Sequence, residues 1–238
     1  MKKGKLFGIG VGPGDPDLLT IKAVKTLNEV DIIICPEKKE AAGSFAYDIA
    51  KKHIKEDAIL LHLTFPMIYN EDELKIKWKE NAEKIAEKIK KGKTLAFITL
   101  GDPTVYSTYM YLLPYLKELE VEVETIPGIT SFCLLAGSMN LPIAEWEESF
   151  CIVPLRKGED DKLSKALDDF DNVIVMKPSN NCRMVADELI KRGLQNNFVL
   201  ISKVGTENQN VVTDIDVIKN EKIPYLSTII IKKKGIKL

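Results

Sequence analysis

The sequence predicts an α/β protein of two domains, the first built on a largely parallel sheet and the second on a mixed sheet. In the first half, short apolar segments alternate with amphipathic helical segments, which is the pattern of a parallel sheet covered by helices. After residue 197, strand segments follow one another without a helix, which indicates an antiparallel portion. We place the boundary near Pro127, giving an N-terminal domain of residues 1–127 and a C-terminal domain of residues 128–238. We expect the active site in the cleft between the two domains, where ligands commonly bind.

Each strand predicted in the first domain is a short apolar run bounded by turn-forming residues. These runs are Lys5–Gly10, Ile32–Cys35, Ala58–Leu63, Thr94–Leu100 and Val121–Ile126. The spacing of apolar residues predicts helices at Asp17–Val30, Ser44–His53, Asn70–Lys91 and Thr104–Leu119. Asp15 and Pro16 suit the start of the first helix, because aspartate accepts from free backbone N–H groups and proline lacks the N–H that a first turn leaves unpaired.

The second domain has a less regular order of elements. Apolar runs predict strands at Phe150–Pro154, Asn172–Lys177, Asn197–Val204, Val211–Asp214 and Ser227–Lys232. Helices are predicted at Ile129–Met139, Asp161–Asp169 and Asn181–Arg192. The last three strands have no predicted helix between them, so we expect antiparallel pairing there.

The charge balance excludes several classes of partner. The chain has 34 Lys and Arg against 35 Asp and Glu, a formal net charge of -1, whereas binding to nucleic acid or to a membrane surface normally needs a basic excess. The basic start, Met1–Lys5, precedes an apolar stretch too short for a signal peptide, and no apolar run approaches the roughly 20 residues that span a bilayer. We therefore expect a cytoplasmic protein that binds neither nucleic acid nor membrane.

Cysteine and histidine usage predicts no protein-bound metal. The four cysteines stand singly and form no CxxC pair, so we expect buried thiols rather than a disulfide framework or a zinc site: Cys35, Cys133, Cys151 and Cys182. His53 falls at a predicted helix end and His62 in a predicted strand, and neither has a partner at the spacing of metal ligands.

The first strand runs into a glycine-rich loop, Gly8–Pro16, that invites a nucleotide-binding interpretation. The loop lacks the Gly-Lys-Ser/Thr of a phosphate-binding Walker loop, and each start of the dinucleotide fingerprint fails, with Pro13, Asp15 or Asp17 at the third glycine position. Aspartates at a helix start would also repel a pyrophosphate. What remains is a tight loop that lets another molecule approach the backbone, or else a plain strand-to-helix turn.

Two later strands end in similar loops. Strand Thr94–Leu100 leads into Gly101–Thr108, and strand Val121–Ile126 leads into Pro127–Ser131. Since the carboxyl ends of parallel strands carry ligand-binding loops, we expect the three loops to converge at one edge of the sheet. Asp102 suits the ammonium group of an amino acid or a pair of hydroxyls, and equally a helix cap.

Taken together, GVGPGDPDLLT (Gly10–Thr20), LGDPTVYS (Leu100–Ser107) and PGITSF (Pro127–Phe132) resemble the tetrapyrrole methylase family over essentially the whole chain. The resemblance implies a two-domain α/β fold that binds S-adenosylmethionine between its domains, with the tetrapyrrole in a trough beside it. Carried over residue by residue, it implies cofactor contacts from nine positions: Pro13, Leu100, Gly101, Asp102, Val105, Thr130, Ser131, Met176 and Gly205. From the sequence alone, Met176 is equally a core residue, since an isolated methionine usually fills space.

Several segments resemble the subgroup that methylates carbon 20 of precorrin-2 in cobalamin biosynthesis. They include Ser107–Leu112 after the second loop, Phe65–Met67 before a long helix, and Met176–Ser179. The resemblance implies substrate contacts at Gly12 and Tyr109, and flat tetrapyrrole rings favour aromatic contacts in general. Tyrosines in a helix also serve packing alone.

The implied reaction is in-line transfer of a sulfonium methyl group to a nucleophilic meso carbon, with Asp102 or Tyr106 as candidate base for the proton that leaves carbon 20. Tetrapyrroles carry carboxylates at their rim, so Arg156 and Arg183 are candidates to bind them, although exposed surface charge is the favoured explanation for each arginine taken alone. Members of the family are commonly homodimers.

Three alternatives stay open. The first is a methylase acting on uroporphyrinogen or at carbon 11 or 17, the second a tetrapyrrole carrier without catalysis, and the third a nucleotide-binding protein, which the failed fingerprints disfavour. The sequence does not distinguish metal-free precorrin-2 from cobalt-factor II as substrate.

Overall fold

The computed structural model describes residues 4–39, 43–66, 68, 70–155 and 160–236. The chain folds into two compact units, Met1–Thr130 and Ser131–Leu238. Each unit holds one five-stranded sheet with helices on both faces, so the predicted α/β class, with a parallel first sheet and a mixed second sheet, is confirmed. The domain boundary at residue 127 stays a prediction.

The first unit is built on a parallel sheet in the order β3-β2-β4-β1-β5. Its strands are β1 (Leu6–Gly10), β2 (Ile32–Glu37), β3 (Ile59–Thr64), β4 (Leu95–Thr99) and β5 (Val123–Ile126). Every neighbouring pair is parallel, and β4 is buried along its whole length. This explains its nearly continuous apolar sequence, since the central strands of a parallel sheet are covered on both faces.

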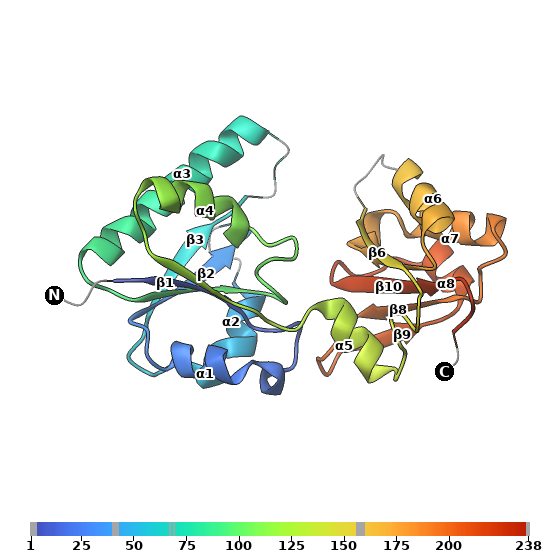
Figure 1. Ribbon diagram of the computed structural model, residues 1–238, viewed down its shortest axis with the longest axis horizontal. Helices are drawn as coiled ribbons and strands as arrows, with labels where there is room; N and C mark the ends of the chain where they lie inside the picture. Colours follow the sequence, from blue (N-terminus) through green and yellow to red (C-terminus); the bar gives the residue numbers. More distant parts are fainter. Residues whose placement is uncertain (1–3, 40–42, 67, 69, 156–159, 237–238) are drawn as a thin grey trace. The chain divides into compact units, whose positions relative to one another are not determined.

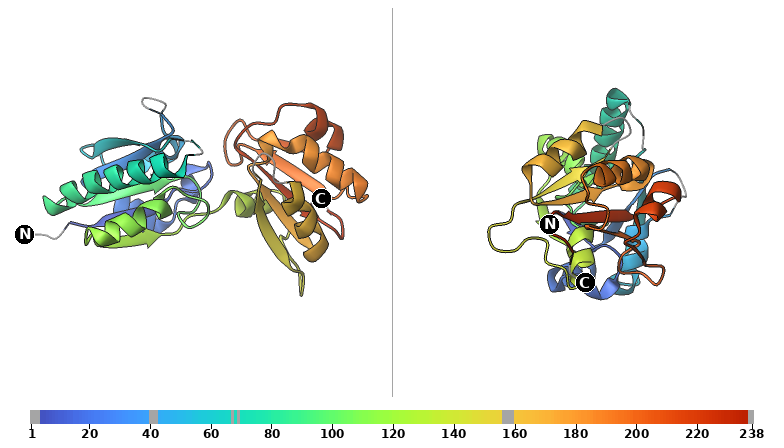
Figure 2. Two further views of the ribbon diagram at one scale, coloured as in Figure 1. Left: turned by 90° about the horizontal axis from the view of Figure 1, so that it is seen from above. Right: turned by 90° about the vertical axis from the view of Figure 1, so that its right-hand side faces the viewer.

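Two pairs of helices cover this sheet (Figures 1 and 2). On one face α1 (Ile21–Leu27) and α2 (Phe45–Ala50) pack in a cluster centred on Ile33 and Ile98, and on the other α3 (Glu71–Lys90) and α4 (Tyr109–Glu118) pack around Phe97. The loops that leave the carboxyl ends of β1, β4 and β5 therefore emerge at one edge of a rigid three-layered unit.

Two predicted helices begin later than the sequence suggested. Pro16–Leu18 forms a short 3-10 turn whose start is capped by Asp15, and α1 begins after Thr20, whose side-chain oxygen accepts from Ala23 N at 3.2 Å. The predicted helix from Thr104 begins only at Tyr109. Tyr106 has φ +52°, a left-handed conformation that no right-handed helix accommodates.

The second unit has a mixed sheet in the order β6-β7-β10-β8-β9. Its strands are β6 (Phe150–Pro154), β7 (Asn172–Met176), β8 (Phe198–Ser202), β9 (Asn210–Val212) and β10 (Ser227–Lys232). Only β6 and β7 pair in parallel, while β10 is antiparallel to β7 and β8, and β9 is antiparallel to β8. The antiparallel portion predicted after residue 197 is confirmed.

Four helices complete this unit. Helices α6 (Asp160–Asp169), α7 (Cys182–Lys191) and α8 (Ile215–Asn220) pack on one face, and α5 (Ser131–Ser138) contacts β10 on the other (Figure 1). Helix α8 corrects the expectation that no helix follows residue 197. Its six residues carry too little periodicity to stand out, but Asp214 caps it by accepting from Asp216 N at 2.9 Å.

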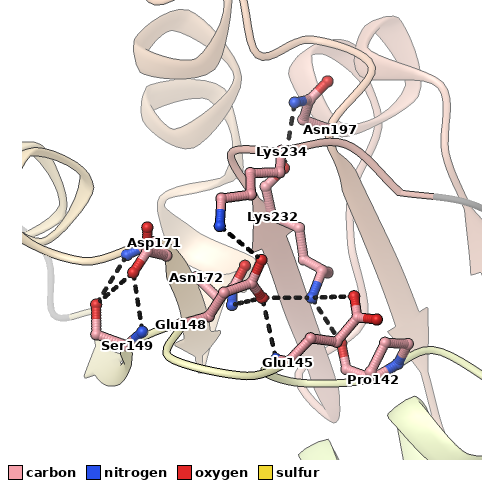
Figure 3. Close-up of polar contacts among 9 residues, drawn as sticks. All are labelled: Pro142, Glu145, Glu148, Ser149, Asp171, Asn172, Asn197, Lys232 and Lys234. Atoms are coloured by element: carbon pink, nitrogen blue, oxygen red, sulfur yellow. Dashed lines mark hydrogen bonds and ion pairs between the residues drawn. The ribbon is translucent and has the colours of Figure 1, made fainter.

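A buried polar cluster lies on the second unit's sheet, at the end where β7 begins and β10 finishes (Figure 3). Lys232, whose side chain is 3% exposed, donates to Pro142 O at 2.9 Å and to Glu148 Oε2 at 3.2 Å. Glu148 also accepts from Asn172 Nδ2 at 3.0 Å and pairs with Lys234 at 3.2 Å. These donors, Asn172 foremost, lower the pKa of the Glu148 carboxyl to about 2.

Candidate functional site

The three predicted loops of the first unit meet, which confirms the predicted convergence. Gly12 and Gly101 form an antiparallel bridge, with Gly101 N donating to Gly12 O at 2.8 Å and Gly12 N to Gly101 O at 3.3 Å. Gly128 N, in the third loop, donates to Asp102 Oδ2 at 2.9 Å. The loops after β1, β4 and β5 are thus held together by backbone and carboxylate hydrogen bonds.

Glycine is required where these loops touch. A Cβ on Gly10 would lie 2.6 Å from both Gly101 O and Gly128 N, and a Cβ on Gly128 would lie 2.3 Å from Gly101 O. All of these neighbours are backbone atoms, which have no rotamer to relieve the clash. Only bare backbone allows the three strand ends to approach so closely.

Gly12 and Gly101 differ from these packing glycines, because they have left-handed backbones and an added Cβ would not clash with a neighbour. Their φ angles are +76° and +70°, and a Cβ would find nothing nearer than Leu18 O at 3.9 Å and Ile129 O at 3.8 Å, respectively. Both residues are buried, so their positive φ angles, rather than a steric clash, favour glycine at these positions. The loops 10–20, 100–108 and 127–130 contain aspartates but no Lys or Arg, so they suit a cationic ligand such as a sulfonium with an ammonium group better than a phosphate.

Asp102 ties two of the loops together. It is only 8% exposed, its Oδ1 accepts from both the backbone N (2.8 Å) and the hydroxyl of Thr104, and its Oδ2 accepts from Gly128 N. It does not cap α4, which begins only at Tyr109. This geometry makes Asp102 an anchor of the loops, and a role as general base stays a prediction.

We expect Asp102→Asn to weaken S-adenosylhomocysteine binding and to lower the free energy of unfolding by about 1–3 kcal/mol. An asparagine amide group has one acceptor oxygen, so either Gly128 N or the Thr104 donors would face an NH2 group. Titration calorimetry and urea unfolding measure the two effects. If instead turnover falls at saturating cofactor while cofactor affinity and stability are unchanged, Asp102 acts as the base and not as an anchor.

The residues that follow Asp102 form a turn with one strained position. Tyr106 is left-handed and 45% exposed, Val105 is half-buried, and Ser107 is buried with its Oγ 2.9 Å from Thr99 Oγ1. A left-handed non-glycine residue costs about 1–3 kcal/mol and occurs often at functional sites. Tyr106 is therefore an exposed side chain at the loop, and its role as a base stays a prediction.

Tyr109 is a correction to the predicted substrate contacts. Its side chain is fully buried, with its ring 5.6 Å from that of Phe97 and its hydroxyl 2.9 Å from Thr125 Oγ1, and burial raises its pKa. A Cβ on Gly8 would lie 2.1 Å from this ring. The ring of Tyr109 therefore occupies the space that a side chain at position 8 would need. Its place in the first unit is that of a core residue.

The other predicted cofactor residues of the first unit lie at the same loops. Pro13 is buried next to Gly12, Leu100 is half-buried before Gly101, and Thr130 is half-buried in the third loop. The structure thus brings together all of the first-unit positions that the family resemblance assigns to the cofactor. Their contacts with a cofactor stay a prediction.

The second unit brings together three further predicted residues around the start of β10. Ser131, at the start of α5, has its Oγ 3.1 Å from Thr228 Oγ1, and Thr228 pairs in register with Met176 on β7. Met176 is half-buried at the end of its strand rather than in the core. Gly205, with φ +76°, follows β8 on the other side of β10 and donates to Gln209 Oε1 at 2.9 Å.

Of the two candidate arginines, only Arg183 lies within the described residues. Arg183 is exposed on the first turn of α7, on a face that also carries Asp187, whereas Arg156 lies outside the described residues. Both stay predictions. Arg192, which the sequence did not single out, links α6 and α7 by pairing with Glu188 and Asp168.

Two of the cysteines are buried, and both histidines lie within hydrogen-bond distance of a neighbouring residue. Burial raises the pKa of the Cys35 thiol to about 12 and that of Cys182 to about 11, while Cys133 is exposed, contrary to the prediction of four buried thiols. His53 Nε2 lies 3.0 Å from Pro16 O, and His62 Nδ1 lies 2.6 Å from Glu37 Oε1. Among the described residues, no three His, Cys, Asp or Glu side chains gather as metal ligands, and no helix is long and apolar enough to cross a bilayer.

The sequence interpretation missed the residues that join the loops to their neighbours. Ser107 and Thr228 carry no motif, because a lone hydroxyl in a turn or strand is too common to indicate a role. The distinction between Gly10 and Gly128, which pack, and Gly12 and Gly101, which leave space, also needs the three-dimensional neighbours of each backbone.

Comparison with known proteins places this geometry in a family. A probable cobalt-precorrin-2 C(20)-methyltransferase of Methanocaldococcus jannaschii is 38% identical over 231 residues, covering 96% of each chain. A precorrin-2 C(20)-methyltransferase of Sinorhizobium sp is 28% identical, covering 96% of this chain and 95% of that protein. The structure of a uroporphyrin-III C-methyl transferase from Thermus thermophilus complexed with S-adenosyl homocysteine shares the fold, with a TM-score of 0.69 at 18% identity over 97% of this chain and 92% of that one.

A family model supports the same assignment over most of the chain. The model of the tetrapyrrole (corrin/porphyrin) methylases matches residues 5–217, a range that includes the three loops of the first unit and the second-unit residues Ser131, Met176 and Gly205. The chain therefore belongs to the tetrapyrrole (corrin/porphyrin) methylase family.

Proposed function

We propose that this protein is an S-adenosylmethionine-dependent methyltransferase that methylates carbon 20 of a precorrin-2-type tetrapyrrole in cobalamin biosynthesis. The observation that carries the proposal is the meeting of three loops at one sheet edge, in a chain whose relatives of matching length are named for this reaction. A structural neighbour complexed with S-adenosyl homocysteine supports the choice of cofactor.

The first unit's loops suit the cofactor. When bound, S-adenosylmethionine supplies an electrophilic methyl group on a cationic sulfur. The loops carry aspartates and carbonyl groups but no Lys or Arg that would repel a sulfonium. Pro13, Leu100, Val105 and Thr130 stand at the same edge, and Ser131, Met176 and Gly205 are the proposed contacts from the second unit.

The chain contributes to catalysis mainly by positioning. Methyl transfer to an electron-rich ring carbon needs no covalent nucleophile from the protein, and holding two reactants in line supplies roughly 7–11 kcal/mol in favourable cases. Asp102 holds the second and third loops in place, and Asp102 and the exposed Tyr106 are the two candidates for accepting the proton that leaves carbon 20. Gly12 and Arg183 are the proposed substrate contacts that the structure describes.

Two finer points belong to the same proposal. We expect a homodimer, as the family resemblance implies, and a cytoplasmic location, as the sequence predicts. The substrate is either metal-free precorrin-2 or cobalt-factor II, and relatives named for precorrin-2 and for cobalt-precorrin-2 both match this chain.

The proposal is tested by incubating the purified protein with S-adenosylmethionine and each form of the substrate, followed by mass spectrometry and NMR assignment of the added methyl. We expect one methyl group at carbon 20 and an equal amount of S-adenosylhomocysteine. A methyl at carbon 11 or 17, or turnover of uroporphyrinogen instead, would establish a different methylase of this family. Tetrapyrrole binding with no S-adenosylhomocysteine formed would establish a carrier.

A further inference from the structure

We propose that Lys177 and Lys203, at the ends of strands β7 and β8, bind carboxylate groups of the substrate. This inference rests on the proposed function, since it deepens the account of how a polycarboxylate tetrapyrrole is held. It starts from two unusual backbone conformations in the second unit, and the charge of the surrounding segments identifies the ligand class.

Both lysines have left-handed backbones, with φ +57° at Lys177 and +50° at Lys203. Of the other non-glycine residues with positive φ in the described part of the chain, Glu120 and Asn140 directly follow helices α4 and α5, where this conformation is an ordinary way to end a helix. Neither lysine follows a helix, although Lys177 directly precedes the 3-10 turn Pro178–Asn180. Each is instead the first residue after its strand, and each is exposed.

The strained conformation is imposed by the surrounding structure. Lys203 N donates to Leu226 O at 2.7 Å, and Lys203 O accepts from both the backbone and the hydroxyl of Thr206. A glycine would relieve the strain at either position, because only residues with a Cβ are disfavoured there. Strain retained at an exposed position points to a role for the side chain itself.

The sheet places the two lysines side by side. Strand β10 lies between β7 and β8, with Thr228 opposite both Met176 and Ile201. Neighbouring strands are spaced about 4.8 Å apart, so the ends of β7 and β8 are about 10 Å apart across β10. Two ammonium groups on flexible stems at that spacing suit a ligand with several separated anionic groups.

The segments that form this edge carry cations and no acids. Residues 172–183, 198–206 and 223–232 contain no Asp or Glu, although the whole chain has 35 of them. The cations of these segments are Lys177, Arg183, Lys203 and Lys232, and Lys232 is committed to the polar cluster at the opposite end of the sheet. Glu207 follows the second segment, and Asp187 lies on the face of α7 that carries Arg183, so the three remaining cations outnumber the nearest acids in sequence by one.

A buried amide without a hydrogen-bond partner lies close in sequence to Lys177. Asn181 directly precedes α7, a ten-residue helix that begins five residues after Lys177. Asn181 is 7% exposed, and its Nδ2 has no hydrogen-bond partner. The Nδ2 atom is itself shielded from solvent, so the proposed carboxylate site rests on the two lysines.

The test replaces each lysine with asparagine, which removes the charge but tolerates the left-handed conformation. The probe is uroporphyrin III, a stable tetrapyrrole with carboxylates around its rim, and its affinity is measured by fluorescence titration at fixed ionic strength. We expect the dissociation constant to rise about tenfold for Lys177→Asn or Lys203→Asn and about a hundredfold for the pair. Lys177→Arg and Lys203→Arg keep the charge and are expected to bind within about threefold of the natural protein.

The control is Lys191→Asn, at the far end of α7, where the lysine is 73% exposed and paired with Glu188. It is expected to leave uroporphyrin affinity unchanged. S-adenosylhomocysteine affinity, measured in parallel, is expected to be the same in every variant. Unchanged uroporphyrin affinity in the double asparagine variant would overturn the carboxylate site while leaving the proposed function intact, whereas absence of S-adenosylhomocysteine binding in the natural protein would overturn the proposed function itself.

Discussion

Gly128→Ala is expected to abolish detectable S-adenosylhomocysteine binding and to lower the free energy of unfolding by about 2–3 kcal/mol. The added Cβ would lie 2.3 Å from Gly101 O and 2.8 Å from Gly10 C, so the third loop must move away from the other two. That movement also breaks the bond from Gly128 N to Asp102, which links the loops. Calorimetric titration and urea unfolding measure the two losses.

The matched control is Gly137→Ala, in helix α5, where an added Cβ meets nothing within 4 Å. Alanine is the better helix former, so this variant is expected to gain about 0.5–1 kcal/mol and to keep its cofactor affinity. The change from glycine to alanine should therefore lower the free energy of unfolding at position 128 and raise it at position 137. Normal cofactor binding by Gly128→Ala would contradict the role that we give to close backbone packing.

Lys232→Met is expected to lower the free energy of unfolding of the second unit by about 3 kcal/mol, because it breaks a buried ion pair and leaves the partner groups behind. Lys232 is 3% exposed and bonds both Glu148 and the carbonyl of Pro142, so it joins the end of β10 to the segment before β6 (Figure 3). Thermal and urea unfolding of the variant and the natural protein measure the loss.

Lys234→Met is the control, since this lysine contacts the same carboxylate but is 68% exposed. An exposed pair contributes little, so we expect a change below about 1 kcal/mol. The pKa of Glu148 is lowered from 4.5 to about 2. The ionised carboxylate therefore contributes fully to the free energy of unfolding above pH 4.5, and this contribution is lost as the pH falls toward 2. The urea midpoint should therefore fall less steeply on acidification in Lys232→Met than in the natural protein. An equal dependence of the urea midpoint on pH in the two proteins would contradict this account.

Much of the first unit was predictable because each of its elements has a recognisable local sequence pattern. Each strand is a short apolar run, and the loops after β1, β4 and β5 carry glycine and proline at the strand ends. Parallel strands place such loops at one edge whatever the details of packing, so their convergence followed from chain order alone. The late starts of α1 and α4 were not predictable, since they depend on a cap at Thr20 and on the strained turn at Tyr106.

The site residues also divide into those that the sequence predicted and those that it did not. Pro13, Gly101 and Asp102 stand at the strand-end loops where their motifs placed them, because each loop directly follows its own strand. Tyr109 was misjudged because helical spacing does not say which face of α4 meets the sheet, and the space beside Gly8 decided it. The meeting of Ser131, Thr228 and Met176 joins residues from distant parts of the second unit, which no local pattern encodes.

By itself, the sequence determined the α/β class, the three converging loops and the resemblance to the tetrapyrrole methylases, since these depend on local propensity, periodicity and chain order. Only the tertiary structure decided which glycines pack and which leave space, that Asp102 ties the loops together, and that two strained lysines flank β10. The physical reason is that sterics and hydrogen bonding between distant segments depend on distances that the order of residues does not contain.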